Sequence, residues 1–167
     1  MQEVHIKLRF NRVCLGAAKR KRNGYVVFCF ERDPNQRVMF LSSLWGALMR
    51  YAAKLTNRHQ NVVKKIDWCP VVSGTPKKDW RRTIIRRPAH TKSAQPPRAH
   101  FAVHEAFVPG DVVELSAVLP AEISIEDFMQ LLIVVGKYRG FSPFNNAQEK
   151  YGTFEVLSVE KTTGFGE

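Results

Sequence analysis

The chain has 167 residues, 44% of them hydrophobic, so it can form a core and is too apolar for a disordered tail. Lys and Arg total 26 against 15 Asp and Glu; the net charge of +11 favours a polyanionic partner. The three cysteines form no C-x-x-C pair, which argues against a zinc ribbon or disulfide framework and favours reduced thiols. No signal-peptide pattern and no apolar run of membrane-spanning length occur, so we expect a soluble cytoplasmic protein.

Strands are expected to dominate the first forty residues. Apolar and polar residues alternate over 4–10, which predicts a half-buried strand that continues to Leu15. Residues 16–24 form an expected loop, whose four adjacent cations need solvent or phosphate around them. These cations are Lys19, Arg20, Lys21 and Arg22. Further strands are expected over 25–30 and 38–40.

An amphipathic helix is expected from Ser42 and Ser43 to about Asn57. The serine hydroxyls are expected to cap its first turn, and a helix N-terminus favours anions such as phosphate. Gly46 has no side chain, so another backbone or a ligand can approach closely there. A short helix followed by a strand is expected between 61 and 72.

The composition becomes strongly basic over 73–98, where Asp79 is the one acid and Trp80 is embedded among cations. We expect an extended arm or β-hairpin that projects from the core. Interleaved cations and aromatics suit single-stranded nucleic acid, because cations follow the phosphates and an indole can stack on a base. The alternative is a flexible loop whose Trp80 packs back on the core. The candidate binding residues of the arm are Lys77, Lys78, Trp80, Arg81, Arg82, Arg86 and Arg87.

The C-terminal part predicts two more strands, a helix and a final strand. Residues 100–119 are expected to form a hairpin around a Pro-Gly-Asp turn. A helix follows, with Ser124 as its N-cap and Asp127 as the acidic partner of the cap. A loop is expected over 137–146 and a strand over 151–161. The core then has the order β-α-β-β-α-β, which predicts an α+β, ferredoxin-like (RRM-like) fold in one domain, with the arm inserted.

Residues 40–50, Phe-Leu-Ser-Ser-Leu-Trp-Gly-Ala-Leu-Met-Arg, resemble the helix start of the RAMP superfamily, the RNA-binding proteins of CRISPR effector complexes. The turn at 108–111, the helix at 125–138 and the glycine-containing segment 138–155 are similar to the C-terminal part of that family. Two features depart from its pattern. The glycine-rich loop holds fewer glycines, and Trp45 stands where a basic residue is common. Trp45 can replace that cation with a stacking surface or pack into the core.

The resemblance implies a non-catalytic subunit of a CRISPR-like ribonucleoprotein, or a phage or mobile-element relative of one. In the family, the loop after the first strand, the start of the first helix and the glycine-rich loop converge on single-stranded RNA, and an inserted hairpin acts as a thumb. The candidate nucleic-acid-binding residues outside the arm are Lys19 to Arg22, Ser42, Ser43, Arg50, Lys137, Tyr138, Arg139 and Phe141. We expect Trp80, Tyr138 and Phe141 to stack on bases. The expected partners are single-stranded RNA or DNA and other ribonucleoprotein subunits, with no cofactor and no membrane.

Two other functions stay open. Some relatives are endoribonucleases that use a histidine near the first helix, which makes His59 a candidate general base. A lone histidine after a helix is more commonly a polar cap, and the loop aspartate of the other nuclease type has no counterpart in 16–24. His100 and His104 share a strand face but lack the further ligands of a metal site, so no metal is expected. The third function is an interaction or inhibitor protein that docks on a ribonucleoprotein through the basic arm.

Overall fold

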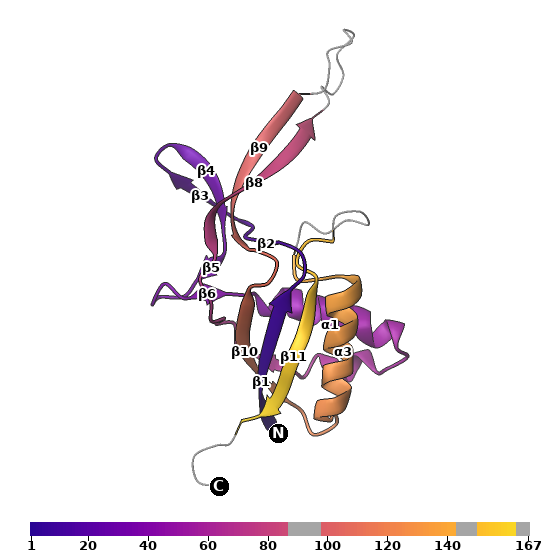
Figure 1. Ribbon diagram of the computed structural model, residues 1–167. Helices are drawn as coiled ribbons and strands as arrows, with labels where there is room; N and C mark the ends of the chain where they lie inside the picture. Colours follow the sequence, from indigo (N-terminus) through magenta and orange to yellow (C-terminus); the bar gives the residue numbers. More distant parts are fainter. Residues whose placement is uncertain (87–97, 143–149, 163–167) are drawn as a thin grey trace.

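Figure 1 shows a computed structural model of the chain, which describes residues 1–86, 98–142 and 150–162. Side chains are described in the same ranges apart from 85–86 and 98–99. The fold is of the mixed α+β kind and contains two main sheets, one below the other in the view of Figure 1.

The lower sheet is antiparallel and has the strand order β11-β1-β10-β7. Its strands are β1 (Gln2–Phe10), β7 (Asp67–Trp68), β10 (Val112–Leu119) and β11 (Phe154–Lys161). The helices α1 (Ser42–Leu55) and α3 (Ile125–Tyr138) pack against one of its faces, and the short α2 (Gln60–Val63) follows α1.

The main core lies between the lower sheet and these helices. Val4, Ile6 and Leu8 of β1 are fully buried, as the alternation in the sequence predicts, because every second side chain faces the helices. Trp45 on α1 is also fully buried, and its ring stacks on Trp68 at a centroid distance of 4.6 Å. Of the two roles left open for Trp45, the structure therefore shows packing into the core.

The upper sheet carries two hairpins. Its central strand is β9 (Arg98–Phe107), which pairs with β8 (Lys77–Arg86) on one edge. On the other edge it pairs with β2 (Cys14–Leu15) and, in parallel, with β4 (Tyr25–Cys29). β4 in turn pairs with β3 (Ala18–Arg22), while β5 (Glu31–Arg32) and β6 (Val38–Met39) form a separate two-stranded ribbon.

The loop expected over 16–24 is wrong, because residues 18–22 form β3. Asn23 and Gly24, with φ of 52° and 82°, make a two-residue turn between β3 and β4. Positive φ at both positions is the geometry that matches the twist of a hairpin, and Asn-Gly is its strongest short-range signal. The four cations stay exposed on a strand instead of in a loop.

Three other expectations need correction. The hairpin expected over 100–119 is wrong, since β9 and β10 belong to different sheets and the turn at 108–111 passes the chain from one to the other. The strand expected to continue to Leu15 ends at Phe10, and β2 joins the upper sheet. The serines do not cap α1, whose N-cap is Leu41 without a side-chain hydrogen bond. The Ser124 cap of α3 is confirmed, since its Oγ accepts a hydrogen bond from the Asp127 N–H at 3.1 Å.

Candidate nucleic-acid interface

Two basic hairpins diverge at the top of the molecule in Figure 1, and we call them the fork. One prong is β3–β4 and the other is β8–β9. Among the described residues the prongs pair at two positions near their base, Val27 with Val103 and Phe28 with His104. Beyond this base, the part of β4 toward Tyr25 and the part of β9 toward Arg98 do not pair with each other, so the prongs separate.

The strands of the fork contain ten Lys and Arg residues and two acids. One acid, Glu105, is buried and forms an ion pair with Arg32 at 2.6 Å. Arg20 pairs with Glu31 at 3.3 Å. Within the described part of the chain, no ion pair reaches the other exposed cations of the fork, which are Lys19, Lys21, Arg22, Lys77, Lys78 and Arg81.

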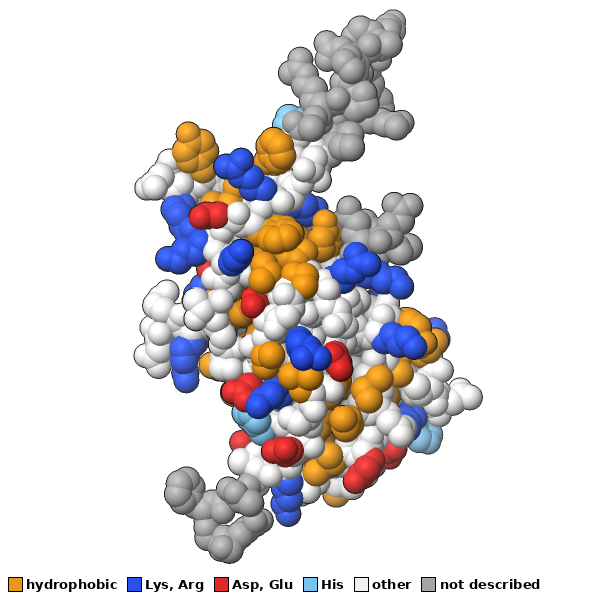
Figure 2. All heavy atoms as spheres, in the orientation of Figure 1, with side chains coloured by type: hydrophobic (Ala, Val, Ile, Leu, Met, Phe, Trp, Pro, Cys, Tyr) orange, Lys and Arg blue, Asp and Glu red, His pale blue; other side chains and the backbone are white. Residues whose placement is uncertain are grey.

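The lower sheet differs from the fork because its exposed cations are neutralised locally. Lys7 lies 3.4 Å from Glu114, and Arg9 lies 2.7 Å from Glu155. In Figure 2, Lys and Arg side chains lie along the hairpins, whereas most acidic side chains lie over the lower part of the molecule. The fork therefore carries exposed cations that no acidic side chain of the described residues neutralises, and these would attract a polyanion.

Strand alternation sorts the side chains of the fork onto two faces. Residues that pair directly share a face, so the Val27–Val103 pair connects one face of the first prong with one face of the second. We call this surface the fork face. By the register of the strands, it contains Arg20, Arg22, Tyr25, Val27, Phe101, Val103 and Arg81.

The opposite face of the fork is partly covered at its base. Phe28 stacks on His104 with centroids 4.7 Å apart. Trp80 is half-buried against the small apolar cluster that contains Val13 and Leu15. The strands of the arm therefore pair as a hairpin, which is one of the forms expected for it. Its Trp80 packs back on the protein, however, as was expected only for the alternative of a flexible loop.

The ring of His104 connects both prongs and has a defined proton position. Its Nδ1 lies 2.8 Å from the Gly16 carbonyl oxygen, which can only accept, so Nδ1 donates. Nε2 then accepts the hydrogen bond of Arg82 Nε at 3.2 Å. Burial lowers the pKa of His104; the bond to Gly16 opposes this shift, and the charge of Arg82 adds to it. Arg82, a predicted phosphate contact, is thus held by a neutral histidine.

A groove of about 290 Å³ lies at the base of the first prong. It brings together the three segments that were expected to converge: the start of β3, the start of α1 and the glycine-containing segment after α3. Ala18 and Cys29 pair directly and both line it, so the groove opens on the fork face. Ser42 and Ser43 are exposed directly after Leu41, which also lines the groove. Its lining is Leu15, Ala17, Ala18, Cys29, Phe30, Glu31, Met39, Phe40, Leu41, Leu44 and Phe141.

Phe141 is buried, with 5% of its surface exposed, so the expectation that it stacks on a base is wrong. Its ring stacks on Phe40 at 4.3 Å and contacts Trp45 at 4.5 Å. Gly140 and Gly152, with φ of 73° and 76°, let the two chain segments approach, and the Phe141 N–H donates to the Gly152 carbonyl oxygen at 2.9 Å. The glycine segment therefore fixes Phe141 as a wall of the groove.

The remaining candidates near α3 and α1 are exposed. Lys137 and Tyr138 belong to the last turn of α3, not to a loop, and Tyr138 is 49% exposed. The Arg139 guanidinium lies 4.6 Å from the centre of the Tyr51 ring on α1. Arg50 donates to the Gly46 carbonyl oxygen at 3.3 Å. For Arg86 only the backbone is described, and Arg87 lies outside the described residues.

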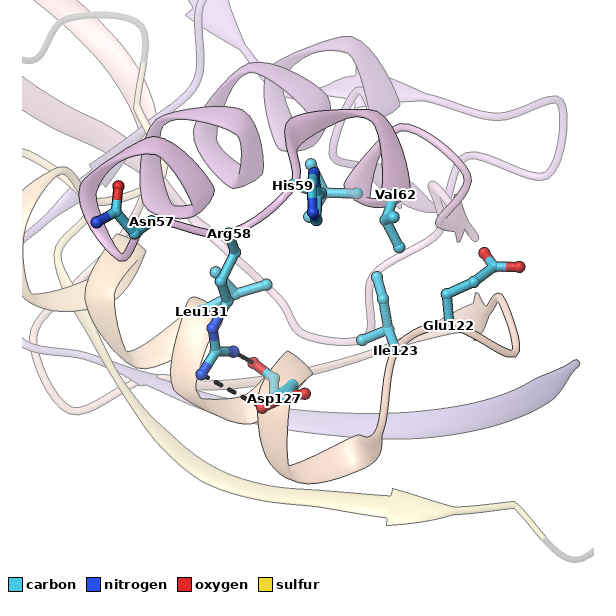
Figure 3. Close-up of a pocket in the computed structure, with 9 residues that line it drawn as sticks. Asn57, Arg58, His59, Val62, Glu122, Ile123, Asp127 and Leu131 are labelled. Carbon is cyan, nitrogen blue, oxygen red and sulfur yellow. Dashed lines mark hydrogen bonds and ion pairs between the residues drawn. The ribbon is translucent and has the colours of Figure 1, made fainter.

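His59 lies at the other end of α1 from the groove. It lines a separate cavity of about 280 Å³ together with Arg58, Glu122 and Asp127 (Figure 3). Arg58 pairs with Asp127 at 3.2 Å. Because the 14 residues of α1 span roughly 21 Å, His59 and the segments around the groove do not form one site.

Sequence reasoning missed Tyr25 and Phe101, which are 75% and 66% exposed on the fork face. The Asn-Gly turn before Tyr25 would have indicated its place near a hairpin tip. Phe101 carries no such signal, because its face depends on the register of β9 with β8. No group of three His, Cys, Asp or Glu residues suited to a metal occurs among the described side chains.

Comparison with known proteins gives similarity in structure alone. No protein-family model and no curated protein matches the chain. One similar solved structure is a chain of the cryo-EM structure of Type III-B Cmr-beta bound to cognate target RNA, with a TM-score of 0.62 and 14% identity. The match covers 96% of this chain and 60% of that one, so this chain spans less than two thirds of its neighbour. The similarity is one of fold. Within the described residues, no helix is long and apolar enough to cross a membrane.

Proposed function

We propose that the chain is a non-catalytic RNA-binding subunit, or a relative of one, that holds single-stranded RNA across the fork face and the adjoining groove. The observation that carries this proposal is the set of exposed fork cations without acidic partners among the described residues. These side chains are positioned by paired strands, and they keep their charge available for phosphates.

The proposed fold is that of the RAMP superfamily, a ferredoxin-like core in one domain with an inserted basic arm at 73–98. Two features of the lower sheet support it. β1 and β7 are parallel with β10 between them, and α1 connects them in sequence. β10 and β11 are parallel with β1 between them, and α3 connects these two. Two such split β-α-β units make a ferredoxin-like core.

The similarity to a chain of an RNA-bound Type III-B complex supports the same proposal. We propose that the partners are RNA and other subunits of a ribonucleoprotein. The lower sheet's open face is a weaker candidate than the fork, because Glu114 and Glu155 already neutralise Lys7 and Arg9.

The salt dependence of RNA binding tests the proposal. Arg22→Gln with Arg81→Gln removes two unpaired cations of the fork face, and Lys54→Gln with Lys64→Gln removes two exposed cations from the region of α1 and α2 far from the fork. If both fork cations contact phosphates, the slope of log K against log salt falls by about 1.4 for the fork variant. The control variant should keep the slope of the original protein. Equal slopes in the two variants would contradict the proposal.

An endoribonuclease that uses His59 is a second candidate, favoured by the cavity that His59 lines together with Arg58 and Asp127 (Figure 3). The ion pair between Arg58 and Asp127 already engages that acid, and the cavity is distant from the fork. RNA cleavage that His59→Ala abolishes while binding persists would favour this candidate.

An interaction or inhibitor protein would instead show no affinity for free nucleic acid and would bind a purified ribonucleoprotein.

A further inference from the structure

The fork face presents two aromatic rings that the packing of the protein does not use. Tyr25 and Phe101 are 75% and 66% exposed. Most other aromatic side chains of the described residues are buried or half-buried in the two apolar clusters, as Trp45 and Phe141 are. The faces of these two rings are therefore open to a partner, which distinguishes them from the aromatic rings that are buried in the clusters.

The strand register puts the two rings in corresponding positions. Val27 pairs with Val103, and Tyr25 and Phe101 each lie two residues further from the base on the same face. The prongs no longer pair at that point and diverge (Figure 1), so the two rings belong to separate prongs but to one face. A flexible single strand can follow two diverging prongs more readily than a rigid duplex.

Each ring has an arginine on its own face. Arg22 pairs directly with Tyr25 across the first prong. Arg81 pairs with Val103 and is thus a diagonal neighbour of Phe101 on the second prong. Neither arginine has an ion pair among the described residues. A cation beside an exposed ring fits a nucleotide, whose phosphate and base can be bound together.

The backbone holds these positions firmly. The first prong has five paired positions from Ala18–Cys29 to Arg22–Tyr25, closed by the Asn23-Gly24 turn. Phe101 lies within the run of consecutive β8–β9 pairs. Rings on paired strands lose little freedom when a base stacks on them, which favours binding.

We propose that Tyr25 and Phe101 stack on the bases of the bound strand and make the fork selective for unpaired nucleotides. This inference rests on the proposed RNA-binding function and adds a base-dependent contribution to its phosphate contacts. It replaces Trp80 and Phe141 as stacking residues, since those rings pack on the protein.

The test compares a fluorescently labelled oligouridine with the same oligonucleotide carrying abasic sites, by anisotropy at fixed salt. The variants are Tyr25→Leu, Phe101→Leu and the double variant, with Val26→Ala, on the opposite face of β4, as control. We expect each single change to weaken binding to oligouridine about tenfold and the double change more, with abasic binding unchanged. The double variant should bind both oligonucleotides equally, whereas the control should keep the preference for bases.

Each outcome decides one question. If the original protein binds RNA with a steep salt dependence but the double variant keeps the preference for bases, the stacking inference is overturned and the proposed function stands. If the original protein binds neither oligonucleotide, both are overturned, and a protein surface becomes the candidate partner of the two rings. Unchanged thermal melting of the double variant ensures that lost binding does not reflect unfolding.

Discussion

His104 makes the stability of the fork depend on pH in a defined direction. The ring is buried and neutral, between the Gly16 carbonyl and Arg82, and its folded-state pKa lies below the ordinary value of 6.5. As the pH falls through 6.5, the unfolded chain takes up a proton that the folded chain excludes. The free energy of unfolding therefore falls as the pH decreases from 6.5 toward the folded-state pKa. Above pH 6.5 the neutral ring makes its full contribution to stability.

The size of this effect is limited by one proton. A single group changes the free energy of unfolding by at most about 1.4 kcal/mol per pH unit. For a chain of this length 1 kcal/mol corresponds to about 2–4 °C, so the midpoint should fall by up to about 5 °C between pH 6.5 and 5.5. Calorimetry of His104→Asn should show a smaller fall, because asparagine does not titrate.

His100→Asn is the matched control, since it removes an exposed histidine from the same face of β9. It should keep the pH dependence of the original protein. If His104→Asn keeps the full pH dependence, the neutral ring between Gly16 and Arg82 is not its source.

Three further changes test other parts of the structure. Gly46→Ala adds a methyl group where nothing described lies within 4 Å, so it should stabilise α1 by about 1 kcal/mol in thermal melts; weaker RNA binding by the same variant would show that RNA approaches there. Arg32→Met leaves the buried Glu105 carboxylate without its cation and should cost about 3 kcal/mol in urea unfolding, whereas Arg32→Met with Glu105→Gln should cost less. Cys69 is exposed and should react with a thiol reagent in the folded protein, whereas Cys14 should not, because burial raises the pKa of its thiol far above the ordinary range.

Local signals predicted the lower half of the molecule well. The alternation in β1 and the Ser124 cap of α3 are set by neighbouring residues, and both are present in the structure. The run Lys19 to Arg22 misled the interpretation because adjacent cations are typical of loops, while the decisive Asn-Gly turn follows the run. A turn signal can outweigh composition when strands on both sides can pair.

Contacts between distant residues determined what the sequence could not predict. The turn at 108–111 indicates a reversal, but whether β10 returns to β9 or joins β1 depends on pairing across more than a hundred residues. Phe141 and Tyr25 are both aromatics next to glycine, yet one is a buried wall and the other an exposed ring. Their difference follows from tertiary packing, which no local pattern records.

The paired strands of the second prong also restrict how the prong can change in length during evolution. A single residue added to β9 between Phe101 and the base would move Phe101 to the other face, which is the side that Trp80 occupies. Two residues added to each strand near the base would carry Phe101 outward and keep it facing the same way. Homologous arms should therefore differ by even numbers of residues per strand. The length of the prong can then vary while the aromatic ring stays on the fork face.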